Sequence, residues 1–145
     1  VILAIVGEAY ESQHKYTELI QRLNLKDRVI CDFNYANIQK TSHVFCAADV
    51  IAQTYISATQ SGVTPLAYHF KIPLLVSDLA GLSTPILEDQ TGMITEIESQ
   101  KIAENLDEML CEKRLSDYQP FFQKIGQKYS WRSFGQSLMS FMDEL

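Results

Sequence analysis

A run of small polar residues in the middle of this chain has the residue types of an anion-binding turn. Residues 50–52 and 73–76 are short apolar stretches of strand length, and residues 57–62 (SATQSG) lie between them. In an open parallel sheet, ligands bind in the crevice beyond the carboxyl ends of the strands. A helix that starts after such a turn presents unpaired backbone N–H groups and the positive end of its dipole to an anion. The run therefore predicts an anion site, although an ordinary strand-to-helix turn uses the same residue types.

The residues around this turn add to the prediction. Pro65 favours a helix start nearby, over residues 65–70, and Thr64 or Ser61 could cap that helix. Asp78 directly follows the second apolar stretch, where it could contact a ligand or cap a turn over residues 79–82. A glycine at position 62 predicts either a positive φ or a close approach of the backbone to a ligand.

A second candidate segment follows an earlier strand. Phe33, Asn34 and Tyr35 come directly after residues 28–33 (RVICDF) and could form an aromatic and amide wall for a flat base. A hydrophobic plug over the sheet would use the same residues, so both interpretations stay open.

Several familiar chemistries lack their motifs. No GxSxG elbow, GxxxxGK[ST] loop or GxGxxG turn follows any strand. Ser61, His69 and Asp78 can be written as a triad, but nothing places the imidazole on the hydroxyl. The three cysteines and three histidines have no metal-ligand spacing, so we expect no metal and no cofactor.

Composition narrows the class of protein. The 145 residues suit one globular domain, with 46% hydrophobic and 21% charged residues. A net charge of −6 argues against nucleic acid as a partner. Unpaired cysteines favour a reducing compartment, and no apolar run has the length of a membrane span or a signal peptide, so we expect a cytoplasmic location. The chain begins at Val1 with a strand pattern and no Met, so we expect it to be a fragment.

Strands and helices alternate along the sequence. The pattern predicts an α/β fold, a Rossmann-like parallel sheet flanked by helices, in one domain over residues 1–145. The predicted strands cover 1–6, 28–33, 49–54, 73–77 and 92–95, and the predicted helices cover 10–23, 38–46, 65–70, 99–111, 116–128 and 130–145. Residues 81–89 are expected to form a loop or a short helical turn. The continuous apolar run over residues 1–6 is typical of a strand covered on both faces.

The last predicted helix carries a wide apolar stripe. Trp131, Phe134, Leu138, Phe141 and Met142 recur at helical spacing. We expect this stripe to be partly uncovered in the chain. The alternative is that the helix only closes the sheet of its own domain.

The order of short motifs resembles one protein family. The chain reads IVGEAY, LKDRVICDF, FCAADVIAQTY, PLAYHFKIPLLVSDLAGL, ILEDQTGMI and YSWRSF in succession. This succession resembles the carboxyl-terminal domain of the group 1 (family 4, GT-B fold) glycosyltransferases over essentially the whole chain. That family has a strand ending in G, then L-x-DRV-x-F, A-DV, a Gly-containing turn and helix, K-P-V-V-x-S-D-x-GG, ED-x-x-TG and a last helix that begins F-S-W.

The resemblance implies a function and a set of site residues. In that family, the carboxyl-terminal domain binds the nucleotide-sugar donor, an amino-terminal domain binds the acceptor, and the terminal helix packs against the amino-terminal domain. The resemblance implies that a membrane association, if any, comes through the amino-terminal half, and that the protein takes part in glycan or lipid-linked glycan synthesis. The donor-binding positions it implies are Gly7, Phe33, Asn34, Tyr35, Gln60, Ser61, Gly62, Val63, Asp78 and Gly81.

The chain also departs from the family pattern. The paired glutamates of the family fall at Ala58 and Leu66, and Thr84 replaces a common glutamate. The basic pair of the family normally precedes the first strand of this chain. Two other functions therefore stay open: a non-catalytic nucleotide-sugar-binding or assembly domain of the same fold, and a receiver-like or flavodoxin-like domain. A receiver needs an acidic cluster after the first strand, where only Glu8 stands.

Overall fold

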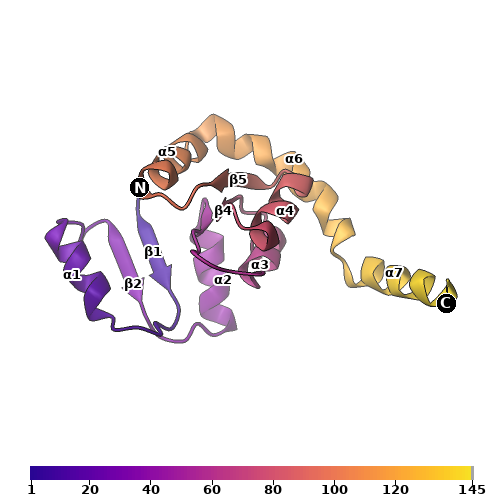
Figure 1. The fold of residues 1–145 in the computed structure, drawn as a ribbon, viewed down its shortest axis with the longest axis horizontal. Coiled ribbons are helices and arrows are strands. Elements are labelled where there is room, and N and C mark those ends of the chain that lie inside the picture. Colours follow the sequence, from indigo (N-terminus) through magenta and orange to yellow (C-terminus); the bar gives the residue numbers. More distant parts are fainter. Residues whose placement is uncertain (145) are drawn as a thin grey trace. The chain divides into compact units, whose positions relative to one another are not determined.

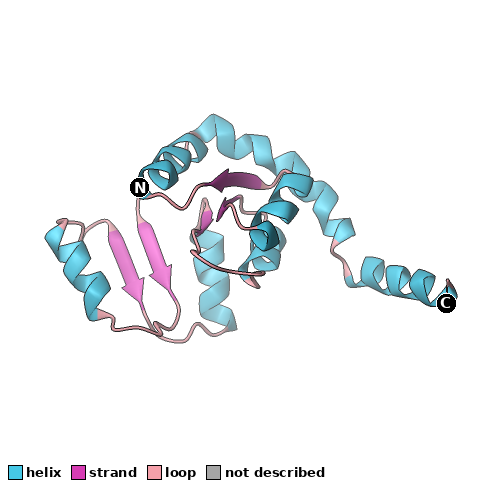
Figure 2. Cartoon of the chain, in the orientation of Figure 1, coloured by secondary structure: helices cyan, strands magenta, loops and turns pink. Residues whose placement is uncertain are grey.

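The structure is a computed structural model that describes residues 1–144, without the side chains of residues 112–114 and 127. Parallel strands alternate with helices along the chain, so the predicted α/β class is confirmed (Figure 1, Figure 2). The chain divides into two compact units, Val1–Val44 and Phe45–Leu145. Each unit has its own parallel sheet, with two strands in the first and three in the second. The sequence predicted one sheet, whereas the structure has two.

The first unit is built on a parallel strand pair. Strand β1 (Leu3–Val6) pairs with β2 (Val29–Asp32), and helix α1 (His14–Arg22) connects them. Gly7 ends β1 with φ +134°, a conformation that favours glycine, and its N–H donates to the Asp32 carbonyl at 3.0 Å. Helix α2 (Ile38–Ala47) begins in this unit. The prediction that residues 1–6 are covered on both faces is wrong for this unit, because Leu3 is half exposed and one complete helix cannot cover both faces of a sheet.

The second unit contains the larger core. Strands β3 (Ile51–Gln53), β4 (Leu74–Ser77) and β5 (Gly92–Thr95) form a parallel sheet in the order β3-β4-β5. Every residue of β4, the central strand, is buried. The helices of this unit are α3 (Val63–Phe70), α4 (Ala80–Asp89), α5 (Ser99–Met109), α6 (Glu112–Lys128) and α7 (Trp131–Asp143). The core includes Leu74, Val76, Leu82, Ile86 and Phe122.

Helix α4 corrects a prediction. A loop or short helical turn was expected over residues 81–89, because Gly81 and Pro85 disfavour a helix interior. The segment is nevertheless a ten-residue helix. Leu82, Ile86 and Asp89 are buried at helical spacing, so packing against the sheet overrides local propensity.

Helix α7 ends the described chain. None of its described residues is buried, and Figure 1 shows it continuing away from the sheet of the second unit. Trp131 is 88% exposed, and Phe141 and Met142 are 59% and 64% exposed. The expectation of a partly uncovered stripe is therefore confirmed, and the alternative that the helix closes its own sheet is wrong. Leu145, the last residue of the predicted helix, lies outside the described residues.

Candidate functional site

The carboxyl edge of β3 and β4 is held by side chains of the second unit. Gln53, the last residue of β3, is 1% exposed and forms side-chain hydrogen bonds with Thr64 of α3, with its Nε2 3.2 Å from the Thr64 hydroxyl. The Ser77 hydroxyl at the end of β4 donates to the Gln53 carbonyl at 3.5 Å. These contacts fix the start of α3 at the end of the strands, where the sequence predicted an anion site.

The turn before α3 uses its serine to satisfy backbone donors. The backbone N–H of Val63 donates to the Ser61 hydroxyl at 3.2 Å, and that of Thr64 donates to the Ser61 carbonyl at 3.3 Å. Helix α3 starts at Val63, two residues before Pro65, and its N-cap is Gly62 with no side-chain cap hydrogen bond, so the prediction that Thr64 or Ser61 caps this helix is wrong. An anion that binds the Val63 N–H would have to displace the Ser61 hydroxyl.

Gly62 does not have the conformation that its residue type suggested. Its φ of −66° and ψ of −12° are ordinary right-handed helical values, and a Cβ placed on it would have no atom within 4 Å. The prediction of a strained positive φ at Gly62 is therefore wrong, since any residue adopts this conformation. Its open surroundings leave room for a ligand to approach the backbone.

Gly81 lies in close contact with the turn over residues 57–62. A Cβ on Gly81 would overlap the backbone carbonyl of Thr59 and lie 3.2 Å from the Thr59 Cα. The first turn of α4 therefore packs directly on the turn over residues 57–62. The resemblance implies that Gly81 lies on a donor-side loop, whereas the structure places it in α4 and gives it a packing role that only glycine can fill there.

The remaining predicted residues of this edge are open to solvent. Asp78 and Gln60 are exposed. The Asp78 backbone N–H donates to the Thr95 carbonyl at 3.0 Å. The N-cap of α4 is Leu79, with no side-chain cap bond. Asp78 therefore does not cap α4, and it directly follows the end of β4.

In the first unit, Asn34 takes part in a charged cluster that the sequence analysis missed. Its side-chain amide and its backbone N–H both donate to Asp32 Oδ1, at 2.9 and 3.2 Å. The Lys40 ammonium lies 2.5 Å from Asp32 Oδ2. The hydrogen bonds from Lys40 and then from Asn34 lower the pKa of Asp32 to about 2. The carboxylate therefore stays ionised at the carboxyl end of β2, with a cation from α2 beside the segment predicted to face a base.

The aromatic residues of that segment differ in their surroundings. The Phe33 ring packs on the Tyr16 ring of α1, with 5.6 Å between centroids, whereas Tyr35 is 73% exposed. Phe33 therefore fits the hydrophobic-plug interpretation, and Tyr35 keeps a free ring face for a base.

The positions of the missing glutamates carry no hydrogen-bonding side chain. Ala58 packs against the core of the second unit, and Leu66 is 39% exposed on α3. Neither side chain can accept a hydrogen bond from a sugar or a ribose hydroxyl.

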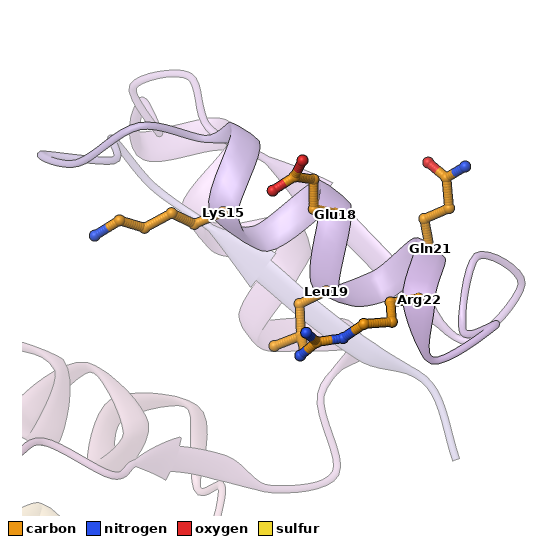
Figure 3. A pocket seen from close by; sticks show the side chains of 5 residues that line it. All are labelled: Lys15, Glu18, Leu19, Gln21 and Arg22. Carbon is orange, nitrogen blue, oxygen red and sulfur yellow. The ribbon is translucent and has the colours of Figure 1, made fainter.

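A surface hollow on α1 is unrelated to these residues. It measures about 670 Å³ and is lined by Lys15, Glu18, Leu19, Gln21 and Arg22 of α1. Figure 3 shows that these side chains leave one helix in different directions, so they do not converge on a ligand. None of the predicted site residues lines this hollow.

Metal-ligand clusters and membrane-spanning helices are both absent from the described part of the chain. Among the residues with described side chains, no three His, Cys, Asp or Glu are grouped as metal ligands. No described helix is both long and apolar enough to cross a membrane.

Comparison with known proteins identifies the fold. No family model and no curated protein sequence matches the chain. Its fold, however, is that found in GT-B glycosyltransferases. HepE from Anabaena, solved with UDP, has a TM-score of 0.79 and 21% identity, and the match covers 100% of this chain and 41% of HepE.

Two further solved structures share this fold. Sucrose-phosphate synthase from Thermosynechococcus elongatus matches with a TM-score of 0.77 and 15% identity, over 99% of this chain and 37% of its own. WaaG, a glycosyltransferase involved in lipopolysaccharide biosynthesis, matches with a TM-score of 0.71 and 17% identity, over 88% of this chain and 33% of its own. The chain thus spans about two fifths or less of the proteins it resembles.

Proposed function

We propose that this chain is the nucleotide-sugar-binding domain of a glycosyltransferase. The observation that carries the proposal is the contact between Gly81 and Thr59, which joins the turn over residues 57–62 to the first turn of α4. Both segments lie at the carboxyl edge of β3 and β4, where ligands of open α/β sheets bind. The HepE structures contain UDP and UDP-glucose, which supports a donor of this chemical class.

The start of α3 is suited to the diphosphate of such a donor. Backbone N–H groups and the positive end of the helix dipole attract a phosphate. Transfer of a sugar leaves negative charge on the departing phosphate, so preorganised N–H donors stabilise the transition state. One such donor contributes about 3–4 kcal/mol in well-studied enzymes. On this chain, the Ser61 hydroxyl would turn away to release the Val63 N–H for that role.

The other residues have distinct roles in this proposal. Gly7, Phe33, Asn34 and Tyr35 of the first unit would take the donor-binding roles that the sequence resemblance implies. Gln60 and Asp78 would contact hydroxyl groups of the donor. The acceptor would be bound by a separate amino-terminal domain, as in the group 1 enzymes that the sequence resembles. The protein would act in the cytoplasm without a metal, and the chain by itself would transfer no sugar.

A second candidate function is favoured by one observation. Ala58 and Leu66 stand at the two positions where glutamates would contact the donor sugar and the ribose. A domain that kept the fold and the phosphate site but lost those contacts would bind nucleotides without catalysing transfer.

Calorimetric titration of the 145-residue chain with UDP, GDP, ADP and UDP-glucose tests the proposal. We expect one nucleotide to bind with a dissociation constant in the range of about 1 μM to 1 mM. Gln60→Ala should weaken that binding, and Gln123→Ala, which changes an exposed glutamine of α6, should not. Absence of binding by all four compounds would refute both candidate functions.

Turnover separates the two candidates. The glycosyltransferase proposal predicts sugar transfer once the chain is joined to an acceptor-binding half, whereas the second candidate predicts nucleotide binding without transfer.

A further inference from the structure

Helix α7 is not held by packing of its own side chains. None of its described residues is buried, and the connection from α6 consists of Tyr129 and Ser130. Ser130 is extended, with φ −75° and ψ 149°, and its hydroxyl accepts a hydrogen bond from the Ser133 N–H at 3.1 Å. The direction of α7 relative to the core of the second unit therefore depends on how this joint is fixed.

One buried carboxylate lies at the joint. Asp89, the last residue of α4, has a side chain only 5% exposed. The Lys128 ammonium lies 2.6 Å from its Oδ1, and the Tyr129 hydroxyl donates to its Oδ2 at 2.6 Å. Asp89 thus binds the last residue of α6 and the first residue of the joint.

A third donor ties the same carboxylate to the core. The Tyr68 hydroxyl of α3 lies 3.3 Å from Asp89 Oδ2 and accepts a hydrogen bond from the buried Thr91 hydroxyl at 3.0 Å. The rings of Tyr68 and Tyr129 pack at 5.4 Å between centroids. Burial, followed by the hydrogen bond to Asp89, raises the pKa of Tyr129, so its hydroxyl keeps the proton that it donates. The joint is therefore connected to α3 and to the loop between α4 and β5.

We propose that Asp89 is a clamp on the joint between α6 and α7, and that it sets the direction in which α7 presents its apolar stripe. Charge-assisted hydrogen bonds of this length are about twice as strong as neutral ones. Two of them converge on a carboxylate whose backbone belongs to the rigid core, while α7 adds no buried contact of its own. This inference goes beyond the proposed function and does not rest on it, because no predicted donor-binding residue takes part in the clamp.

Hydrogen exchange of the full chain tests the clamp. Asp89→Asn keeps the shape of the side chain but removes its charge, so it weakens the bond to Lys128. Glu88→Gln is the matched control, because Glu88 is 62% exposed and lies 3.5 Å from the same ammonium. In Asp89→Asn we expect exchange of the amides of residues 129–134 to rise about tenfold while the β4 amides stay unchanged. Glu88→Gln should change neither group.

Trp131 supplies a second and more direct readout. It is the only tryptophan in the chain and lies two residues beyond Tyr129. In Tyr129→Phe, which removes one hydrogen bond and keeps the ring, time-resolved fluorescence anisotropy of Trp131 should show a larger amplitude of nanosecond motion.

The hydrogen-exchange and fluorescence experiments have one supporting outcome and two contradicting ones. Faster exchange or greater Trp131 motion, confined to the joint and α7 and absent in the control, supports the clamp. Equal acceleration in β4 and the joint would show that Asp89 only stabilises the whole unit, and unchanged exchange and anisotropy would show that the joint is fixed by other contacts. Either result would overturn the proposal.

Discussion

Replacement of Gly81 by alanine tests how the candidate site is built. The added Cβ would overlap the Thr59 carbonyl, a backbone atom that cannot rotate away. Overpacking of this kind costs about 1–3 kcal/mol. Alanine in place of glycine within a helix gains about 0.5–1 kcal/mol. The difference between these two effects is about 0–2.5 kcal/mol, so we expect Gly81→Ala to lower the free energy of unfolding by about 1 kcal/mol.

The chain provides a matched control for this change. Gly126 lies within α6, and a Cβ on it would have no atom within 4 Å. Gly126→Ala should therefore raise the free energy of unfolding by about 0.5–1 kcal/mol. Urea unfolding monitored by circular dichroism measures both variants, and each kcal/mol should move the midpoint by about 0.3–1 M. A Gly81→Ala chain as stable as the Gly126→Ala chain would refute the close approach of α4 to the turn.

Three further substitutions test separate features of the structure. Gly62→Val should leave the melting temperature nearly unchanged, because the φ of −66° at Gly62 suits any residue. It should weaken nucleotide binding about tenfold, because the larger side chain blocks the approach of a phosphate to the backbone N–H groups. Unchanged affinity would place the site elsewhere. Asp32 has a lower pKa in the folded chain than in the unfolded one, so its stabilising effect is present above about pH 4 and lost as the pH falls toward 2. Urea midpoints of wild type and Asp32→Asn should accordingly converge over that window, and a constant difference would contradict the ion pair with Lys40. Tyr68→Phe leaves the buried Thr91 hydroxyl without its acceptor and should cost about 1–3 kcal/mol in thermal unfolding, whereas Tyr55→Phe, at an exposed ring, should cost little; equal effects would argue against the buried network.

The order and type of nearly all elements could be predicted because they depend on local pattern. Four of the five strands are one to three residues shorter in the structure than predicted, and β5 has its predicted bounds. Helix α4 was missed because Gly81 and Pro85 disfavour a helix locally, and only the buried face of Leu82 and Ile86 shows why it forms. The division into two sheets could not be predicted, since apolar periodicity identifies a strand but does not say which strands pair.

The position of the candidate site could be predicted from the sequence, but the contacts between its residues could not. The turn over residues 57–62 and Asp78 lie at the strand ends, as the alternation of elements required. The packing role of Gly81 depends on Thr59, 22 residues earlier, and no local pattern reports such a contact. The buried role of Asp89 has no local signal either, because its partners Lys128 and Tyr129 are 39 and 40 residues away in the sequence.

Amide chemical shifts measured during a titration with UDP test the central proposal most directly. The ¹⁵N-labelled chain reports each backbone N–H separately, so the binding position is read without prior assumption. We predict that the largest shifts fall on Ser61, Gly62, Val63 and the first turn of α4. Shifts confined to α1 or scattered over the surface, or none at saturating UDP, would contradict the assignment of a nucleotide-sugar site to this edge of the sheet.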